Sequence, residues 1–187
     1  LRLGLKDANL VKGASDELAA PMPLLDLVRG HYEEAMKKGW SEKDWAALGA
    51  LARYHRDRWA AAGSRRVLAV GGSAGKTTTT RAAAALLDVL RPGEVHSTPG
   101  NLNNDVGLPM TLLLLDEHHH LAAVEIGTSH RGEIARLAAV ARPDAALLTL
   151  IAPEHTEGIG TLEDVAEEEG DLFAALVEDG CAIGNGD

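Results

Sequence analysis

A glycine-rich turn that carries one lysine and several threonines offers the clearest chemistry in this sequence. The apolar run at 66–70 leads into VGGSAGKTTTT, and a stretch rich in alanine and leucine follows. Glycines allow backbone N–H groups to converge on an anion, and a helix that begins there adds the positive end of its dipole. The pattern predicts a site for a nucleoside triphosphate with Mg²⁺, in which Lys76 contacts the phosphates and the Thr77 hydroxyl binds the metal. This phosphate loop comprises Gly72, Ser73, Ala74, Gly75, Lys76, Thr77 and Thr78.

The match to the general phosphate-loop pattern is incomplete. Val70 stands where that pattern has its first glycine, so only the second half of the motif is present. In the alternative interpretation, Gly71, Gly72 and Gly75 only form a tight turn between a strand and a helix. The position of the lysine and threonines at the start of a predicted helix favours phosphate binding.

Bulk composition limits the classes of function. The chain has 187 residues, 45% of them hydrophobic, a net charge of −10 and only 3% aromatic residues. The negative charge argues against a general nucleic-acid surface, and the shortage of aromatic residues argues against stacking on single-stranded bases. No apolar run reaches the roughly 18 residues of a membrane span, no signal peptide is recognisable, and a single cysteine permits no internal disulfide. We expect a cytoplasmic protein without nucleic-acid or membrane partners, with Cys181 in a buried strand.

The pattern of apolar residues divides the chain near Gly63. Residues 1–62 predict an all-helical segment, with helices at 6–20, 24–38 and 41–62. Residues 63–187 predict strands at 66–70, 94–97, 121–126, 145–150 and 181–184, and helices at 76–90, 108–115, 132–141 and 162–178. Such alternation predicts an α/β fold whose parallel sheet has helices on both faces. Ligands of these sheets lie beyond the carboxyl ends of the strands, where the phosphate loop falls.

Four blocks in a fixed order resemble the central ATP-binding domain of the Mur ligases. They are VGGSAGKTTTT at 70–80, TPGNLNNDVGLPMTLL at 98–113, AVEIGTSHRGEIARLA at 123–138 and APEHTEGIGTLEDVA at 152–166. The resemblance covers about 50–187 and implies ATP-dependent amide-bond formation in peptidoglycan precursor synthesis, in which a carboxylate is activated as an acyl phosphate. It also implies ATP and Mg²⁺ as cofactors, and a UDP-muramoyl peptide and D-alanyl-D-alanine as substrates.

The resemblance assigns roles to individual residues. It implies that Lys76 contacts the phosphates, that Thr77, Glu125 and His155 lie at Mg²⁺, and that the asparagine block holds the UDP-sugar substrate through Asn103 and Asn104. Each assignment has an alternative. Glu125 could instead be a solvated residue at a strand end, and His155 could be a histidine that stabilises a loop without binding metal. The asparagines could instead form side-chain hydrogen bonds that stabilise the turn, without contacting a substrate.

The sequence also departs from the family pattern. Gly71 replaces a threonine and Ala74 an asparagine. Glu169 stands where the family has a lysine that is carbamylated to hold a second metal ion, and the glutamate carboxylate falls short of that reach by roughly 4 Å at ordinary bond lengths. In the alternative interpretation, Glu167, Glu168 and Glu169 form a solvated helix face.

The N-terminal segment resembles a different family. Residues 4–48, beginning GLKDANLVKGASDEL, are similar to the C-terminal helices of β-hydroxyacid dehydrogenases of the 3-hydroxyisobutyrate type, in which the pair matched by Lys6 and Asp7 lies beside the nicotinamide cofactor. The sequence has no Rossmann glycine motif, so we expect only a packing role for these helices.

Three alternatives to an active ligase domain therefore stay open. The chain could be a non-catalytic nucleotide-binding module, a truncated or chimaeric fusion without activity, or a dehydrogenase fragment. The resemblance implies later strands and a C-terminal domain that do not fall within these 187 residues. A sheet cut short in this way would expose an apolar edge or face, which predicts self-association.

Overall fold

The chain forms two compact units, Leu1–Ala47 and Leu48–Asp187. The computed structural model describes residues 2–18, 20, 22, 25–26, 29–30, 33, 37, 44–153 and 158–185. In the first unit, helix α1 (Arg2–Glu17) buries Ala8 and Ser15, and an ion pair joins Lys12 to Asp16 one turn further on. Residues 25–26, 29–30, 33 and 37 are also helical.

A five-stranded, all-parallel sheet forms the framework of the larger unit. Its strands are β1 (Arg66–Gly71), β2 (Val95–Ser97), β3 (Leu121–Glu125), β4 (Ala145–Leu148) and β5 (Cys181–Gly184). Their order is β2-β3-β1-β4-β5, which places β1 at the centre. The core residues of β1 and β3 are apolar in nearly continuous runs, as is usual for strands that are covered on both faces. The predicted α/β fold is confirmed.

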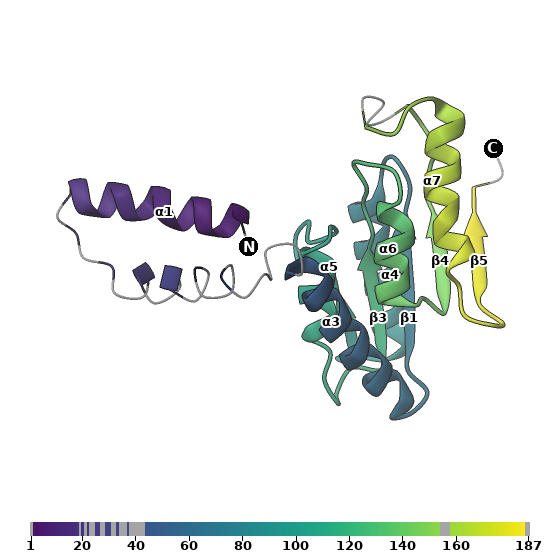
Figure 1. The fold of residues 1–187 in the computed structure, drawn as a ribbon. Helices are drawn as coiled ribbons and strands as arrows, with labels where there is room; N and C mark the ends of the chain where they lie inside the picture. Colours follow the sequence, from purple (N-terminus) through teal and green to yellow (C-terminus); the bar gives the residue numbers. More distant parts are fainter. Residues whose placement is uncertain are drawn as a thin grey trace. The chain divides into compact units, whose positions relative to one another are not determined.

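Helices cover both faces of this sheet (Figure 1). They are α4 (Lys76–Leu90), α5 (Gly107–Leu113), α6 (Glu133–Ala141) and α7 (Leu162–Ala174). The chain moves from β1 outward to β2 through α4 and then returns across the sheet through α5, α6 and α7. Because parallel crossovers are right-handed, this reversal puts α4 on one face and the other three helices on the opposite face. The contacts agree, since α4 packs on β2 and β3 while α6 packs on α5 and α7.

Helix α3 (Asp44–Ala61) packs against the α5 and α6 side of the sheet. Ala52 and Trp59 belong to the main core, and the Trp59 indole N–H donates to the His119 carbonyl at 2.9 Å. The sequence had suggested a domain boundary at residue 62. The structure groups residues from Leu48 onward with the sheet, because the buried face of α3 forms part of its core.

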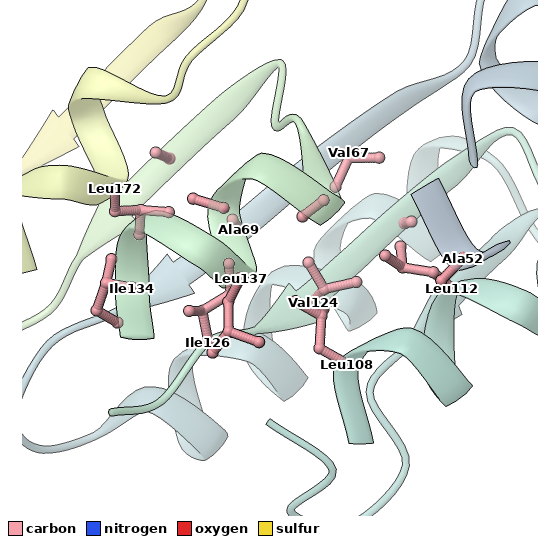
Figure 2. Close-up of a cluster of buried hydrophobic side chains, with 14 of the residues drawn as sticks. Ala52, Val67, Ala69, Leu108, Leu112, Val124, Ile126, Ile134, Leu137 and Leu172 are labelled. Atoms are coloured by element: carbon pink, nitrogen blue, oxygen red, sulfur yellow. The ribbon is translucent and has the colours of Figure 1, made fainter. Parts of the chain in front are cut away.

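The main core lies between the sheet and helices α3, α5, α6 and α7 (Figure 2). Val67 and Val124 of the central strands belong to one buried cluster with Leu112 of α5 and Leu137 of α6, and all four are almost completely buried. Burial of each such side chain stabilises the fold by about 1.5–3 kcal/mol. This packing fixes the carboxyl ends of β1 and β3, where the predicted site begins.

Several predicted bounds and one predicted burial differ from the structure. β4 ends at Leu148 rather than at residue 150, because the next two residues bond to the phosphate loop. α7 ends at Ala174 rather than at residue 178, and the Val177 N–H then donates to the Pro143 carbonyl. The expectation of a buried Cys181 is wrong, since β5 is an edge strand whose four residues are all exposed. In the part of the chain that is described, no helix is long and apolar enough to cross a membrane.

Candidate functional site

The phosphate loop joins the end of β1 to the start of α4, as predicted. Two of its glycines adopt positive φ, with +114° at Gly72 and +83° at Gly75. Other residues rarely adopt this conformation, and a Cβ on Gly72 would also overlap the Thr149 hydroxyl. The glycines at these two positions are therefore required by the shape of the turn.

One side of the loop is bonded to the chain that follows β4. The Ser73 N–H donates to the Leu150 carbonyl at 2.7 Å, and the Ser73 hydroxyl lies 2.9 Å from both the N and the O of Ala152. The Thr149 hydroxyl donates to the Ala74 carbonyl at 2.6 Å, and the Gly71 carbonyl lies 3.1 Å from the same oxygen. These bonds hold the loop in one shape before any ligand arrives.

The other side of the loop faces solvent at the N-terminus of α4. Gly72 and Ser73 are buried, whereas Ala74, Gly75 and Thr78 are exposed. The N–H groups of Gly72 and Ser73 already donate to protein acceptors, so phosphate donors would have to come from Ala74 onward. These groups stand at the positive end of the helix dipole, which favours an anion.

Lys76 lies over the loop to which the sequence assigned it. Its ammonium group donates to the carbonyls of Gly72 at 2.6 Å and Ser73 at 3.1 Å. An incoming phosphate would offer the same ammonium group a charged acceptor in place of these neutral ones, and charged acceptors form the stronger hydrogen bonds. The geometry suits a lysine that exchanges backbone carbonyls for phosphate oxygens.

Glu125 lies at the carboxyl end of β3, at the same edge of the sheet as the loop. It is the register partner of Val70, and it is only 2% exposed. Its carboxylate accepts a 2.7 Å hydrogen bond from the Asn103 amide, and its backbone N–H donates to the Thr98 hydroxyl at 2.8 Å. The alternative of a solvated strand end is therefore wrong for Glu125.

The two predicted substrate asparagines make protein contacts of different kinds. Asn103 contacts Glu125 through its side-chain amide. The Asn104 side-chain oxygen accepts from the N–H groups of Val106 at 3.2 Å and Gly107 at 2.9 Å, which is the turn-forming role that the sequence left open. Contact of either residue with a substrate stays a prediction.

The oxygen donors at this end of the sheet suit Mg²⁺ that is shared with a bound phosphate. They do not suit a metal ion whose ligands all come from the protein. Among the described residues, no group of three or more histidine, cysteine, aspartate or glutamate side chains could hold a metal ion. Mg²⁺ is usually held by one or two protein oxygens together with phosphate oxygens and water, and the Thr77 hydroxyl and Glu125 carboxylate are donors of that class. His155 lies outside the described residues, so its role as a ligand stays a prediction.

Two glutamates of α7 are buried, which contradicts a solvated face for them. Glu168 is 5% and Glu169 2% exposed, while Glu167 is exposed. The Glu168 carboxylate accepts from the N–H groups that begin α6, at 2.6 Å from Gly132 and 2.9 Å from Ile134. Glu169 accepts from the Gly72 N–H at 2.8 Å. Neither contact was predicted from the sequence, although the apolar residues at 165 and 172 lie at helical spacing from both glutamates and mark that face of α7 as buried.

A family match agrees with this site. Residues 70–187 match the family described as the Mur ligase middle domain, which covers more than half of the chain and includes both the phosphate loop and Glu125. The chain belongs to the Mur ligase family. As a Mur ligase domain, it has the fold that the four sequence blocks suggested.

Curated relatives are ligases that act on a muramoyl tripeptide. The chain is 44% identical over 141 residues to UDP-N-acetylmuramoyl-tripeptide--D-alanyl-D-alanine ligase of Escherichia coli (strain K12), an alignment that covers 75% of this chain and 30% of that enzyme. It is 43% identical over 122 residues to the enzyme of the same name from Bacillus subtilis (strain 168), which covers 65% of this chain and 26% of that enzyme.

Solved structures of relatives have the same fold. MurF from Acinetobacter baumannii superposes with a TM-score of 0.71 at 32% identity, over 76% of this chain and 30% of that one. MurF ligase from Thermotoga maritima, solved in complex with ADP, gives a TM-score of 0.68 at 32% identity, over 78% of this chain and 33% of that one. This Mur ligase domain therefore spans about a third or less of the length of these relatives.

The second resemblance found in the sequence receives no such support. The family match begins at residue 70, and none of these comparisons supports a likeness of residues 4–48 to β-hydroxyacid dehydrogenases. The first unit is therefore described by its helices alone.

Proposed function

We propose that this Mur ligase domain binds ATP with Mg²⁺ as part of a ligase that forms an amide bond in a peptidoglycan precursor. The observation that carries the proposal is the phosphate loop, whose solvent-facing residues begin α4 and whose lysine lies over the turn. The Thermotoga maritima relative was solved in complex with ADP, which supports nucleotide binding as the function of this domain.

The site residues divide into those that bind phosphate, those that hold Mg²⁺ and those that contact the UDP-sugar. Lys76 and the N–H groups from Ala74 onward bind the phosphates, and Thr77 and Glu125 hold Mg²⁺ together with His155. Bound Mg²⁺ would neutralise negative charge while a carboxylate is converted to an acyl phosphate. By their names, the relatives join D-alanyl-D-alanine to a UDP-N-acetylmuramoyl tripeptide, and we propose the same two substrates here. Asn103 and Asn104 are the proposed contacts to the UDP-sugar.

Calorimetric titration with ATP and MgCl₂ tests the nucleotide site. Lys76→Ala removes a charged phosphate contact and should weaken ATP binding by about 1.5 to 3 kcal/mol, or roughly 10- to 150-fold in affinity. Arg81→Ala is the matched control, since Arg81 is exposed further along the same helix and should bind ATP like the parent chain.

Two results would contradict the proposal. One is the absence of saturable ATP binding in a sample whose circular dichroism shows a folded protein. The other is an equal loss of affinity in Lys76→Ala and Arg81→Ala, since that would place the site elsewhere.

A nucleotide-binding module without ligation is the second candidate. It is favoured by the burial of Glu169 against the protein backbone, at the position where the resemblance implies a carbamylated lysine. The assay supplies the remaining domains of a relative's ligase in trans, because this chain spans only about 30% of such an enzyme. Release of ADP that is stimulated by a UDP-muramoyl tripeptide with D-alanyl-D-alanine would then decide for the ligase, and ATP binding without such release would decide for the module.

A further inference from the structure

The carboxylate of Glu169 is bonded to the peptide through which the chain enters the phosphate loop. Its Oε2 accepts the Gly72 N–H at 2.8 Å, and the two residues are 97 positions apart in the sequence. Glu169 is only 2% exposed, so water does not compete for this bond.

Both ends of the Gly71–Gly72 peptide are held. On one side, Glu169 accepts the Gly72 N–H. On the other, the Gly71 carbonyl accepts from the Thr149 N–H at 3.1 Å. Because a peptide group is planar, fixing its N–H and its C=O fixes the orientation of the whole plane. This plane sets the direction in which the chain leaves β1.

Gly71 provides the space for this carboxylate. A Cβ built on Gly71 would lie 3.0 Å from Glu169 Oε2, 2.9 Å from Leu172 Cδ2 and 3.1 Å from Leu148 Cδ2, which is closer than ordinary contact. Gly71 is not among the residues with positive φ. Glycine is therefore needed at position 71 because a side chain there would not fit beside Glu169 and its neighbours.

We propose that Glu169 is a positioning residue that orients the first peptide of the phosphate loop and so prepares the N–H groups from Ala74 onward for a phosphate. This proposal deepens the nucleotide-binding function proposed above and rests on it. Glu169 acts through the backbone at Gly72 and does not itself contact the nucleotide. A loop that is already in its binding shape loses less conformational freedom when the ligand binds.

Amide hydrogen exchange measures this role without any nucleotide. In Glu169→Ala the Gly72 N–H loses its buried acceptor, and its exchange should become at least about tenfold faster. In Glu169→Gln the side-chain carbonyl can still accept the bond, so Gly72 should stay protected. Glu167→Ala is the control, because Glu167 is exposed on the same helix and should leave the exchange of Gly72 unchanged.

Titration with ADP in the absence of Mg²⁺ connects this contact to binding. Glu169→Ala should weaken ADP binding by about tenfold, whereas Glu169→Gln and Glu167→Ala should bind ADP like the parent chain. Gly71→Ala provides a second route if Glu169→Ala fails to fold. Its added methyl group would press on the Glu169 carboxylate as well as on Leu172 and Leu148, without removing any core atom, so it should both expose Gly72 to exchange and weaken ADP binding.

Three outcomes would overturn the proposal. Unchanged exchange at Gly72 in Glu169→Ala or Gly71→Ala would show that the carboxylate does not hold the loop. Faster exchange with unaltered ADP affinity would show that the contact has no bearing on binding. A Glu169→Gln variant that keeps Mg²⁺-free ADP affinity but loses the gain from Mg²⁺ would make Glu169 a metal ligand. If the parent chain binds no nucleotide, the function proposed above fails, and the exchange experiment still decides whether Glu169 holds the loop.

Discussion

A single amide connects the asparagine-rich loop to the buried carboxylate of Glu125. The Asn103 Nδ2 lies 2.7 Å from Glu125 Oε1, and a Cβ on Gly127 would lie 2.9 Å from the same nitrogen. Glycine at 127 thus leaves room for the asparagine. A buried carboxylate needs such donors to keep a fixed orientation, and a metal ligand in particular depends on them.

Asn103→Ala tests this role at the scale of one residue. Loss of the amide leaves the Glu125 carboxylate without a positioned donor, so we expect ATP binding in the presence of Mg²⁺ to weaken by about three- to tenfold. ADP binding without Mg²⁺ should not change. Calorimetry under the two conditions separates these effects, and Asn101→Ala, an exposed asparagine of the same loop, is the control. Equal losses with and without Mg²⁺ would refute a role through the metal ligand.

At the scale of elements, α7 is the helix on which the loop depends. A capping box begins it: the Thr161 hydroxyl accepts the Asp164 N–H at 3.3 Å, and the Asp164 carboxylate accepts the Thr161 N–H at 2.8 Å. The pKa of Asp164 is held below its ordinary value, first by these bonds to Thr161 and then by Arg131. The same helix carries Glu168 to the start of α6 and Glu169 to the phosphate loop.

Thr161→Ala should destabilise the fold through this cap. Removing a threonine N-cap costs about 1 kcal/mol in the free energy of unfolding, and urea titration followed by circular dichroism would measure it. Thr161→Ser keeps the accepting oxygen and should stay within a few tenths of a kcal/mol of the parent chain. A serine variant as unstable as the alanine variant would assign the effect to the lost methyl group instead.

Local sequence patterns were sufficient to predict where some helices and strands begin and end, and insufficient for others. α4 begins at Lys76 and ends at Leu90 as predicted, because a glycine turn precedes it and Pro92 and Gly93 follow it. The ends of β4 and α7 were placed too late, since both depend on bonds to distant parts of the chain. The loop glycines and Lys76 were likewise visible in the sequence. The burial of Glu169 was not, because it follows from how α7 packs on the sheet.

At the scale of the molecule, the face of the sheet that carries α4 is only partly covered. α4 packs mainly on β2 and β3, and no other described helix of the larger unit packs on the β4 and β5 side of that face. A groove of about 550 Å³ lies there, at the end of the sheet opposite the phosphate loop, with Leu68, Leu87 and Ile183 among its lining. The end of α4 adds exposed apolar side chains at Leu86 (69%), Val89 (77%) and Leu90 (75%).

We expect the chain to self-associate through this face. Apolar surface of this kind on an isolated domain favours contact with another copy. The weight-average mass from sedimentation equilibrium should rise with protein concentration, and the double variant Leu86→Glu with Val89→Glu should reduce that rise. Arg81→Glu, another exposed change on the same helix, is the control. A constant monomer mass at all concentrations would contradict the expectation.

The central place of β1 in the sheet has a consequence for the order of folding. Both of its partners come much later in the chain, since Leu68 pairs with Ala123 on one side and with Ala145 on the other. Pairing between distant segments makes folding slow, because long loops must close before any contact rewards them. Because residues after β4 and on α7 bond to the phosphate loop, we expect the loop to take its shape only after these two elements have joined β1. A nucleotide would then bind a chain that has nearly finished folding and would not guide the early steps.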